Sequence, residues 1–240
     1  MTLKQIYELL DAISPFELQE GWDNSGVQIG KDDDEIAKIY LSLDIDRALL
    51  ENVKPNSLII THHPLIFKGL KSFNPSLYPA SLLQIMVQKN ISQIAMHTNF
   101  DKTHLNKFVA KNILGLEVLK SEDFCLHLKV EKSFEDFCQD VKKALKMEYL
   151  RVVEAKDYIK TAVLTTGSGG DFISKIKSDC FLTGDLKYHQ ALEAKENNLS
   201  LIDIGHYESE CHFTAALSEE LQKIKLKVIM SNSFNPFKYK

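Results

Sequence analysis

The sequence predicts an α/β protein in which candidate metal-binding side chains directly follow strands. Short apolar runs of strand type alternate along the chain with segments whose apolar residues recur at helical spacing. Three of these runs lead into clusters of histidine and acidic residues: 57–61 into His62-His63, 91–96 into His97 to Asp101, and 199–204 into His206 to Glu210. Ligand sites in α/β proteins form at the carboxyl ends of strands, and imidazole with carboxylate suits divalent metals. The chain is therefore interpreted first as a metalloprotein.

The chain to about residue 121 alternates between helix and strand. Ile6, Leu10 and Ile13 recur at helical spacing and predict an amphipathic helix at the start, and Ser14 to Glu17 resemble the capping box of a short second helix. The elements expected next are strands at 27–29, 36–43, 57–61 and 91–96, and helices at 46–53, 77–89 and 104–114. This order is typical of a largely parallel sheet covered by helices.

A second α/β unit is expected at residues 122–199, so that residues 1–121 plus 200–240 form the first domain and carry the metal ligands. The second unit has predicted strands at 125–130, 149–153, 161–165 and 180–183, and helices at 134–146, 171–176 and 187–195. The chain then continues with a strand at 199–204, a long helix at 206–223 and a strand at 227–230. Gly167 to Gly170 could form a phosphate-binding turn, but they lack the lysine of a P-loop and are interpreted as a plain tight turn.

The composition is that of an ordinary soluble globular protein. The 240 residues are 44% hydrophobic and 26% charged. The net charge of −4 does not indicate a polyanion-binding surface, so nucleic acid is not an expected partner. No apolar run approaches the roughly 20 residues that a membrane helix needs. The four cysteines are too widely spaced for a thiolate zinc site. We expect a cytoplasmic protein that does not bind membranes.

His62 and His63 are the first ligand candidates. Adjacent strand residues point to opposite faces, so the two imidazoles converge only if the strand has ended, which Pro64 favours. Each could then face a different metal of a pair. A surface histidine pair or a helix-capping turn is an equally good interpretation of these residues alone.

The other candidates lie after the second and third strands. His206 and Glu210 are four residues apart, which places them on one face of a helix. They could equally belong to a solvated helix start, where acidic residues favour the helix dipole. Asp101 is a natural carboxylate ligand four residues after His97, and its alternative role is the N-cap of the following helix. The occurrence of all three clusters after strands favours the metal site.

Five motifs in this order resemble those of the Nif-three-like proteins, a family often catalogued as GTP cyclohydrolase 1 type 2 homologues. The motifs are Trp22-Asp23-Asn24-Ser25-Gly26, Thr61-His62-His63-Pro64-Leu65-Ile66-Phe67, His97-Thr98-Asn99-Phe100-Asp101, Thr183-Gly184-Asp185, and Gly205-His206 with Glu210. They span nearly the whole chain, which resembles the short members that lack an inserted middle domain.

The resemblance implies two interlocked α/β domains with a dinuclear metal site between them. It implies that two divalent ions are held, with Glu210 bridging them, by His62, His63, Asp101, His206 and Glu210. Zinc or iron is favoured, and manganese, cobalt or nickel also suits histidine and oxygen donors. The family architecture further implies a ring-shaped homohexamer, built as a trimer of dimers.

The leading functional hypothesis is a dinuclear metal-dependent hydrolase of the GTP cyclohydrolase type, which opens the guanine imidazole ring and releases formate. Two divalent ions against Asp101 and Glu210 leave about two positive charges, which favours a small anionic substrate such as a nucleotide. His97 and His189 are candidates for proton transfer. The same ligands would also serve a metal storage or delivery protein, an adaptor, or a metal-dependent phosphoesterase.

Overall fold

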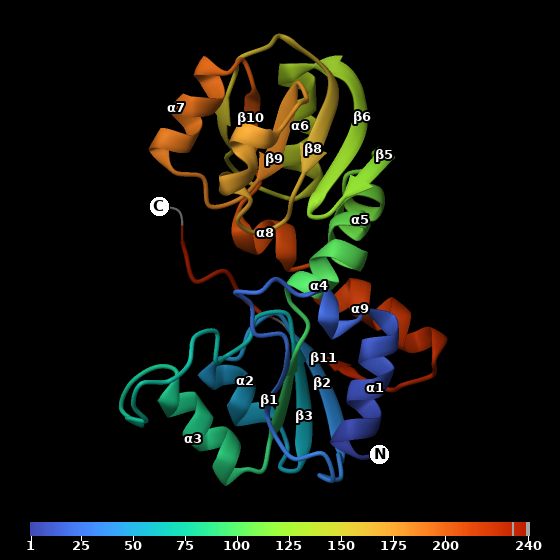
Figure 1. Ribbon diagram of the computed structural model, residues 1–240, viewed down its shortest axis with the longest axis vertical. Coiled ribbons are helices and arrows are strands. Elements are labelled where there is room, and N and C mark those ends of the chain that lie inside the picture. Colours follow the sequence, from blue (N-terminus) through green and yellow to red (C-terminus); the bar gives the residue numbers. More distant parts are fainter. Residues whose placement is uncertain (232, 239–240) are drawn as a thin grey trace. The chain divides into compact units, whose positions relative to one another are not determined.

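The computed structural model describes residues 1–231 and 233–238, which divide into two compact units (Figure 1). Unit 1 comprises 1–103 and 213–236, and unit 2 comprises 104–212 with the last described residues. Each unit contains its own sheet. The prediction of an α/β protein with two sheets is thereby confirmed.

Unit 1 is built on a five-stranded sheet with the strand order β1-β4-β3-β2-β11. Its elements are α1 (Leu3–Ile13), η1 (Phe16–Leu18), β1 (Gly26–Ile29), β2 (Lys38–Ser42), α2 (Arg47–Asn52), β3 (Ser57–Thr61), α3 (Ala80–Gln88), β4 (Ser92–Ala95), α4 (Thr98–Phe100), α9 (Phe213–Lys223) and β11 (Ile229–Met230). β11, β2, β3 and β4 are parallel, and β1 is antiparallel to β4. The parallel strands therefore end at one common edge.

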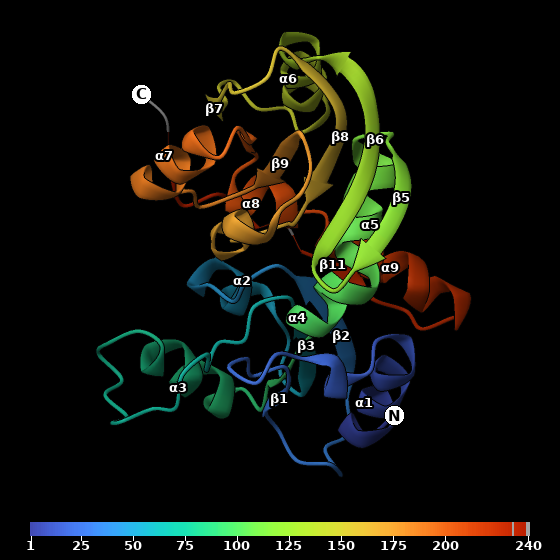
Figure 2. The ribbon, with the colours of Figure 1, turned by 45° about the horizontal axis from the view of Figure 1, so that its top comes forward.

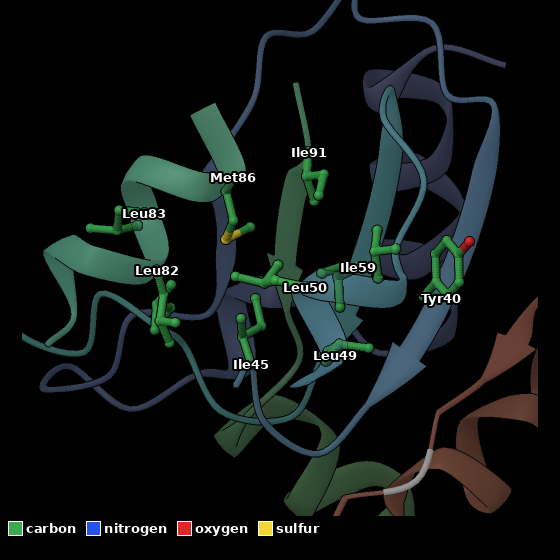
Figure 3. Packing of buried hydrophobic residues seen from close by; sticks show 11 residues of the cluster. Tyr40, Ile45, Leu49, Leu50, Ile59, Leu82, Leu83, Met86 and Ile91 are labelled. Atoms are coloured by element: carbon green, nitrogen blue, oxygen red, sulfur yellow. The ribbon is translucent and has the colours of Figure 1, made fainter. Parts of the chain in front are cut away.

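Helices cover both faces of the unit 1 sheet. Figure 1 shows α1 and α9 on the opposite side of the sheet from α2 and α3. On the α2–α3 side, Tyr40 and Ile59 of the sheet belong to one buried cluster with Leu50 and Met86 of the helices (Figure 3). Every residue of β3 is buried, which agrees with the apolar run Leu58-Ile59-Ile60 at its centre. This packing fixes the strand end from which His62 and His63 emerge.

Unit 2 is built on a six-stranded mixed sheet with the order β5-β6-β8-β9-β10-β7. Its elements are α5 (Asn106–Phe108), η3 (Val109–Ile113), β5 (Glu117–Glu122), β6 (Cys125–Ser133), α6 (Phe134–Ala144), β7 (Arg151–Val153), β8 (Tyr158–Leu164), η4 (Gly170–Lys175), β9 (Cys180–Thr183), α7 (Tyr188–Glu196), β10 (Ser200–Asp203) and α8 (His206–Glu210). Figure 2 shows β5, β6 and β8 side by side. β8, β9 and β10 are parallel, so their carboxyl ends also share an edge.

The observed division differs from the expected domain boundaries at two places. Residues 200–212, expected in the first domain, lie in unit 2 because β10 pairs with β9 and β7. Residues 104–121 also lie in unit 2, where β5 pairs with β6. Hydrophobic periodicity identifies a strand but does not reveal which strand it pairs with. The expected domain boundaries therefore differ from the boundaries of the two observed units.

Three local expectations are also corrected. Ser14 does not cap the short helix: η1 has Pro15 at its N-cap without a side-chain bond, and the Ser14 hydroxyl pairs with that of Thr103. The expected helix 206–223 is two helices, α8 and α9, separated at residues 211–212. The expected helix 104–114 belongs to a helical run from 98 to 113 with two π-helical segments, the first being η2 (Asp101–Leu105). Among the described residues, no helix is long and apolar enough to cross a membrane.

Candidate metal centre

Three histidines of unit 1 meet at the carboxyl edge of its sheet. His62 and His63 directly follow β3, and His97 follows its parallel neighbour β4. The imidazole of His62 lies with its centroid 4.9 Å from that of His63 and 5.1 Å from that of His97. One ligand atom from each of the three lies within 4.8 Å of the others, so the group could hold a metal ion. The predicted convergence of His62 and His63 after the strand end is therefore seen.

In each of these histidines the Nδ1 atom has an oxygen partner. His62 Nδ1 lies 2.9 Å from the carbonyl oxygen of Met96, which can only accept, so this nitrogen donates. His63 Nδ1 lies 2.7 Å from Asp44 Oδ1, and His97 Nδ1 lies 2.8 Å from Asp23 Oδ1. A neutral imidazole that donates through Nδ1 carries its lone pair on Nε2. This arrangement is the usual orientation of a metal-binding histidine.

Asp101 lies beside the His62 ring. Its Oδ1 is 3.5 Å from His62 Nε2, and its side chain is almost completely buried. Asp101 stands at the start of η2, inside the helical run, and His97 is the residue that precedes the run. The alternative role of Asp101 as a helix N-cap is therefore excluded. A buried carboxylate facing an imidazole lone pair is well placed to share a cation with it.

Asp23 anchors His97 and the loop before β1. Its carboxylate accepts hydrogen bonds from the Thr98 backbone N–H at 3.1 Å and from the Ser25 hydroxyl at 2.8 Å. Burial raises the pKa of the Asp23 carboxyl, but hydrogen bonds from His97, Thr98 and Ser25 outweigh it. The pKa therefore lies well below its ordinary value, and Asp23 is a permanent carboxylate.

His206 and Glu210 form the corresponding cluster in unit 2. Both lie on α8, which follows β10, and His206 Nε2 is 2.9 Å from Glu210 Oε2. His206 Nδ1 is 2.7 Å from Asp185 Oδ2, and Asp185 follows the neighbouring parallel strand β9. The predicted placement on one helical face is seen, with Glu210 buried and His206 partly exposed.

Glycines allow close approach around the unit 2 cluster. A Cβ at Gly184 would lie 2.6 Å from the His206 backbone nitrogen, and one at Gly167 would overlap the Glu210 carboxylate. The N–H of Gly167 donates to the Ser209 hydroxyl at 3.0 Å, and that of Gly169 donates to the Thr183 hydroxyl at 2.7 Å. These partners engage two N–H groups that a phosphate would need, which supports the interpretation of a plain tight turn.

His189 differs from the other candidates in its surroundings. It lies on α7, its side chain is exposed, and its ring packs edge-on against Tyr188 with centroids 5.3 Å apart. A role for His189 in proton transfer stays a prediction.

Sequence reasoning did not assign roles to the three carboxylates that orient the histidines. Asp23 and Asp185 belong to the motifs quoted above, but no role was predicted for either. Asp44 was not among the candidate residues. A usable signal exists for two of them: Asp44 and Asp185 follow β2 and β9, the strands that run parallel to and beside those preceding His63 and His206. An acidic residue after the adjacent parallel strand is thus a marker for a metal-binding histidine.

The residues fit divalent metal ions. Four imidazoles, those of His62, His63, His97 and His206, have Nδ1 next to an oxygen acceptor. Asp101 and Glu210 place carboxylate oxygens beside two of these rings at the Nε2 side. Neutral imidazole and carboxylate are the donors expected for a first-row divalent ion.

Comparison with known proteins decides the family. The model of the family described as Duf34/NIF3 (NGG1p interacting factor 3) matches residues 1–236. The chain belongs to this family. The resemblance drawn from the motifs is thereby confirmed, and the NIF3 fold agrees with the two mixed sheets and the His/Asp/Glu clusters.

NIF3 relatives of similar length match the chain from end to end. A protein from Campylobacter jejuni named "GTP cyclohydrolase 1 type 2 homolog" is 50% identical over 240 residues, covering 100% of both chains. A Helicobacter pylori protein named "GTP cyclohydrolase 1 type 2" is 42% identical over 98% of this chain and 97% of its own. The chain therefore corresponds to the short members of the family.

Solved structures share the NIF3 fold over the whole chain. A hypothetical protein from Staphylococcus aureus has a TM-score of 0.87 at 26% identity, covering 100% of this chain and 99% of that one. Reduced HcgD from Methanocaldococcus jannaschii has a TM-score of 0.82 at 28% identity, covering 98% of each chain.

Proposed function

We propose that the protein is a dinuclear metal-dependent hydrolase of the GTP cyclohydrolase type. The observation that carries the proposal is the set of imidazoles whose Nδ1 atoms face oxygen acceptors, leaving Nε2 for a metal. The names of relatives at 42% and 50% identity support the choice of reaction. The reaction would add one water at C8 to open the imidazole ring, and a second water would hydrolyse the resulting formamide to release formate.

The proposed ligands come from both units. They are His62, His63, Asp101, His206 and Glu210, with Glu210 bridging the two ions. The covalent chain supports this combination, because Glu210 precedes Phe213 by three residues, which span at most about 11 Å. The Phe213 ring packs against His62 with centroids 5.1 Å apart.

Bound divalent ions would supply Lewis acidity and lower the pKa of water. The residues of the chain would bind, orient and exchange protons around them. Asp44 and Asp185 would hold the imidazoles of His63 and His206 in the metal-binding tautomer. His97, fixed through Nδ1 by Asp23, would present Nε2 to the substrate for proton transfer.

Charge alone would recognise a nucleotide weakly. Two dications against Asp101 and Glu210 leave about two positive charges, but Asp44 and Asp185 each lie 2.7 Å from an imidazole of the ligand set. These carboxylates diminish the surplus. Together with Asp101 and Glu210, they balance the four positive charges of two dications, so the base must contribute to affinity through contacts of its own.

Asp101→Asn tests the proposal because it keeps the size of the side chain and removes its negative charge. We expect metal-replete Asp101→Asn to lose GTP turnover by two orders of magnitude or more, with formate and phosphate release followed separately. His127→Ala is the matched control: this histidine lies on β6 and pairs with Glu122, and its removal should leave turnover unchanged.

The products distinguish the alternatives. Release of phosphate without formate would show that the protein is a phosphoesterase and not a cyclohydrolase. Release of neither product, together with rapid transfer of metal to an apo-protein, would favour a metal-delivery protein. Full turnover by Asp101→Asn in metal-controlled buffer would show that the assigned site is wrong.

A further inference from the structure

An aromatic platform stands next to the histidine group of unit 1. Trp22 is 61% exposed and Phe67 is 40% exposed, so both rings are accessible to a ligand. The two rings meet with centroids 6.0 Å apart at 63°. Each also meets the His97 ring edge-on, Trp22 at 6.3 Å and Phe67 at 6.0 Å. His97 in turn belongs to the group that could hold a metal.

The segments that carry the platform are held firmly. Next to Trp22, Asp23 binds His97, Thr98 and Ser25. The Asn24 side chain donates to the carbonyl oxygen of Ile66 at 2.6 Å, which ties the Trp22 loop to the residue before Phe67. A partly buried hydrogen-bond network around Asp23 and an exposed hydrogen bond from Asn24 therefore hold the segments of two rings that fill no core. A platform fixed before binding loses little entropy when a planar ligand stacks on it.

We propose that Trp22 and Phe67 form a stacking subsite for the purine base of the substrate nucleotide. The inference rests on the proposed function, and it names the contact by which the base is recognised. An indole face accepts a heteroaromatic ring through stacking and apolar contact. A guanine base stacked on these rings would lie one ring contact from His97, with the imidazole part of the base close to the histidine group of unit 1.

A base fits this surface better than a protein partner does. The platform consists of two rings beside imidazoles that need access to metal and substrate, and a second copy of the chain laid over Trp22 and Phe67 would close that access. Because the charge of the metal centre would attract a nucleotide only weakly, binding needs a further contact that does not depend on charge. Stacking of the base supplies such a contact.

The sole tryptophan of the chain makes the subsite directly measurable. With excitation at 295 nm, we expect guanosine and guanosine monophosphate to quench Trp22 fluorescence saturably in both chelator-treated and zinc-loaded protein. Ribose 5-phosphate should cause no quenching. This readout needs no turnover.

Calorimetry on variants provides the energetic test. Trp22→Ala should weaken guanosine monophosphate binding by roughly 5- to 100-fold, the range typical of a lost base–aromatic stack, and Trp22→Phe should restore most of it. Binding of ribose 5-phosphate to Trp22→Ala should be unchanged. Tyr149→Ala, which removes an exposed ring of unit 2, is the control and should bind guanosine monophosphate as the wild type does. In turnover assays the Trp22→Ala effect should lie in KM rather than kcat.

The outcomes separate the subsite from the reaction. Formate release with an unchanged KM in Trp22→Ala, or the absence of saturable quenching by either guanine ligand, would overturn the subsite. A change of sedimentation in Trp22→Ala without loss of nucleotide binding would identify the platform as a contact between copies and also overturn it. Trp22-dependent binding without any formate release would uphold the subsite and refute the cyclohydrolase.

Discussion

At the scale of single residues, the metal centre depends on which atom of each histidine is left for the ion. Oxygen acceptors at Nδ1 determine this, and they come from Met96, Asp44, Asp23 and Asp185. The ligand types were predictable from the sequence because histidine and carboxylate follow apolar strands. The acceptors were not assigned, because each is separated in sequence from its histidine by 19 residues or more, and the signal for Asp44 and Asp185 requires knowing which strands are neighbours.

Gly167→Ala should disturb the metal centre without unfolding the protein. Gly167 has φ +67°, and an added Cβ would meet the Glu210 carboxylate. We expect a loss of unfolding free energy of about 1–2 kcal/mol from the left-handed backbone, and a marked loss of bound zinc because Glu210 is displaced. Urea unfolding in chelator and elemental analysis after reconstitution measure the two effects.

Gly115→Ala is the matched control for this substitution. Gly115 has φ +65°, and nothing lies within 4 Å of the position that its Cβ would occupy. It should show a similar loss of stability and normal zinc content. Equal zinc content in the two variants would contradict the proposed role of Glu210.

At the scale of elements, the unit 2 sheet carries its candidate metal-binding residues at one edge and a stabilising hydrogen-bond cluster at the opposite edge. In unit 2, His206 and Asp185 follow the carboxyl ends of β10 and β9. Asp179 precedes β9 at the opposite edge, where it binds Lys156 Nζ at 2.6 Å and the N–H groups of Lys160 and Thr161. Substitutions at this second edge should therefore affect stability and leave the metal centre unchanged.

Asp179→Asn should reduce stability in a pH-dependent way. Burial raises the pKa of Asp179, but the hydrogen bond and charge of Lys156 and the backbone N–H groups outweigh it, so the pKa lies below its ordinary value. A carboxyl whose pKa is lowered by folding stabilises the protein above the unfolded-state pKa, near 4, and loses this contribution as the pH falls through the folded-state pKa.

We expect Asp179→Asn to cost about 1 kcal/mol at pH 7, with the difference from wild type shrinking below about pH 4. Urea unfolding across this range measures it, and Asp33→Asn, at an exposed turn, is the control. A difference that stays constant down to pH 3 would show that the charge of Asp179 does not contribute.

At the scale of the whole molecule, the chain passes from unit 2 to unit 1 at a point where the sequence predicts one uninterrupted helix. The expected helix 206–223 breaks at residues 211–212, so that Glu210 belongs to unit 2 and Phe213 to unit 1. We propose, from the family architecture, that six chains assemble into a ring as a trimer of dimers, with the metal centres facing its interior.

Assembly should not depend on metal. Because ring contacts would arise from packed helix and strand surfaces, light scattering should give a species of six 27.3 kDa chains before and after chelation. Asp101→Asn should assemble equally well. A monomer at micromolar concentration in metal-replete buffer would refute the hexamer.

The sequence by itself determined the α/β class, most strands and helices, the motifs of the NIF3 family and the candidate ligands. These features are local. Hydrophobic periodicity predicts a helix or strand, and a residue that directly follows a strand lies at the carboxyl end of that strand whichever strand it pairs with. Only the tertiary structure decided that β10 pairs with β9, that the chain divides near residues 103 and 213, and that Asp44 and Asp185 orient the histidines of the neighbouring strands. These features depend on which strands are neighbours, and strand pairing is set by packing between segments far apart in the chain.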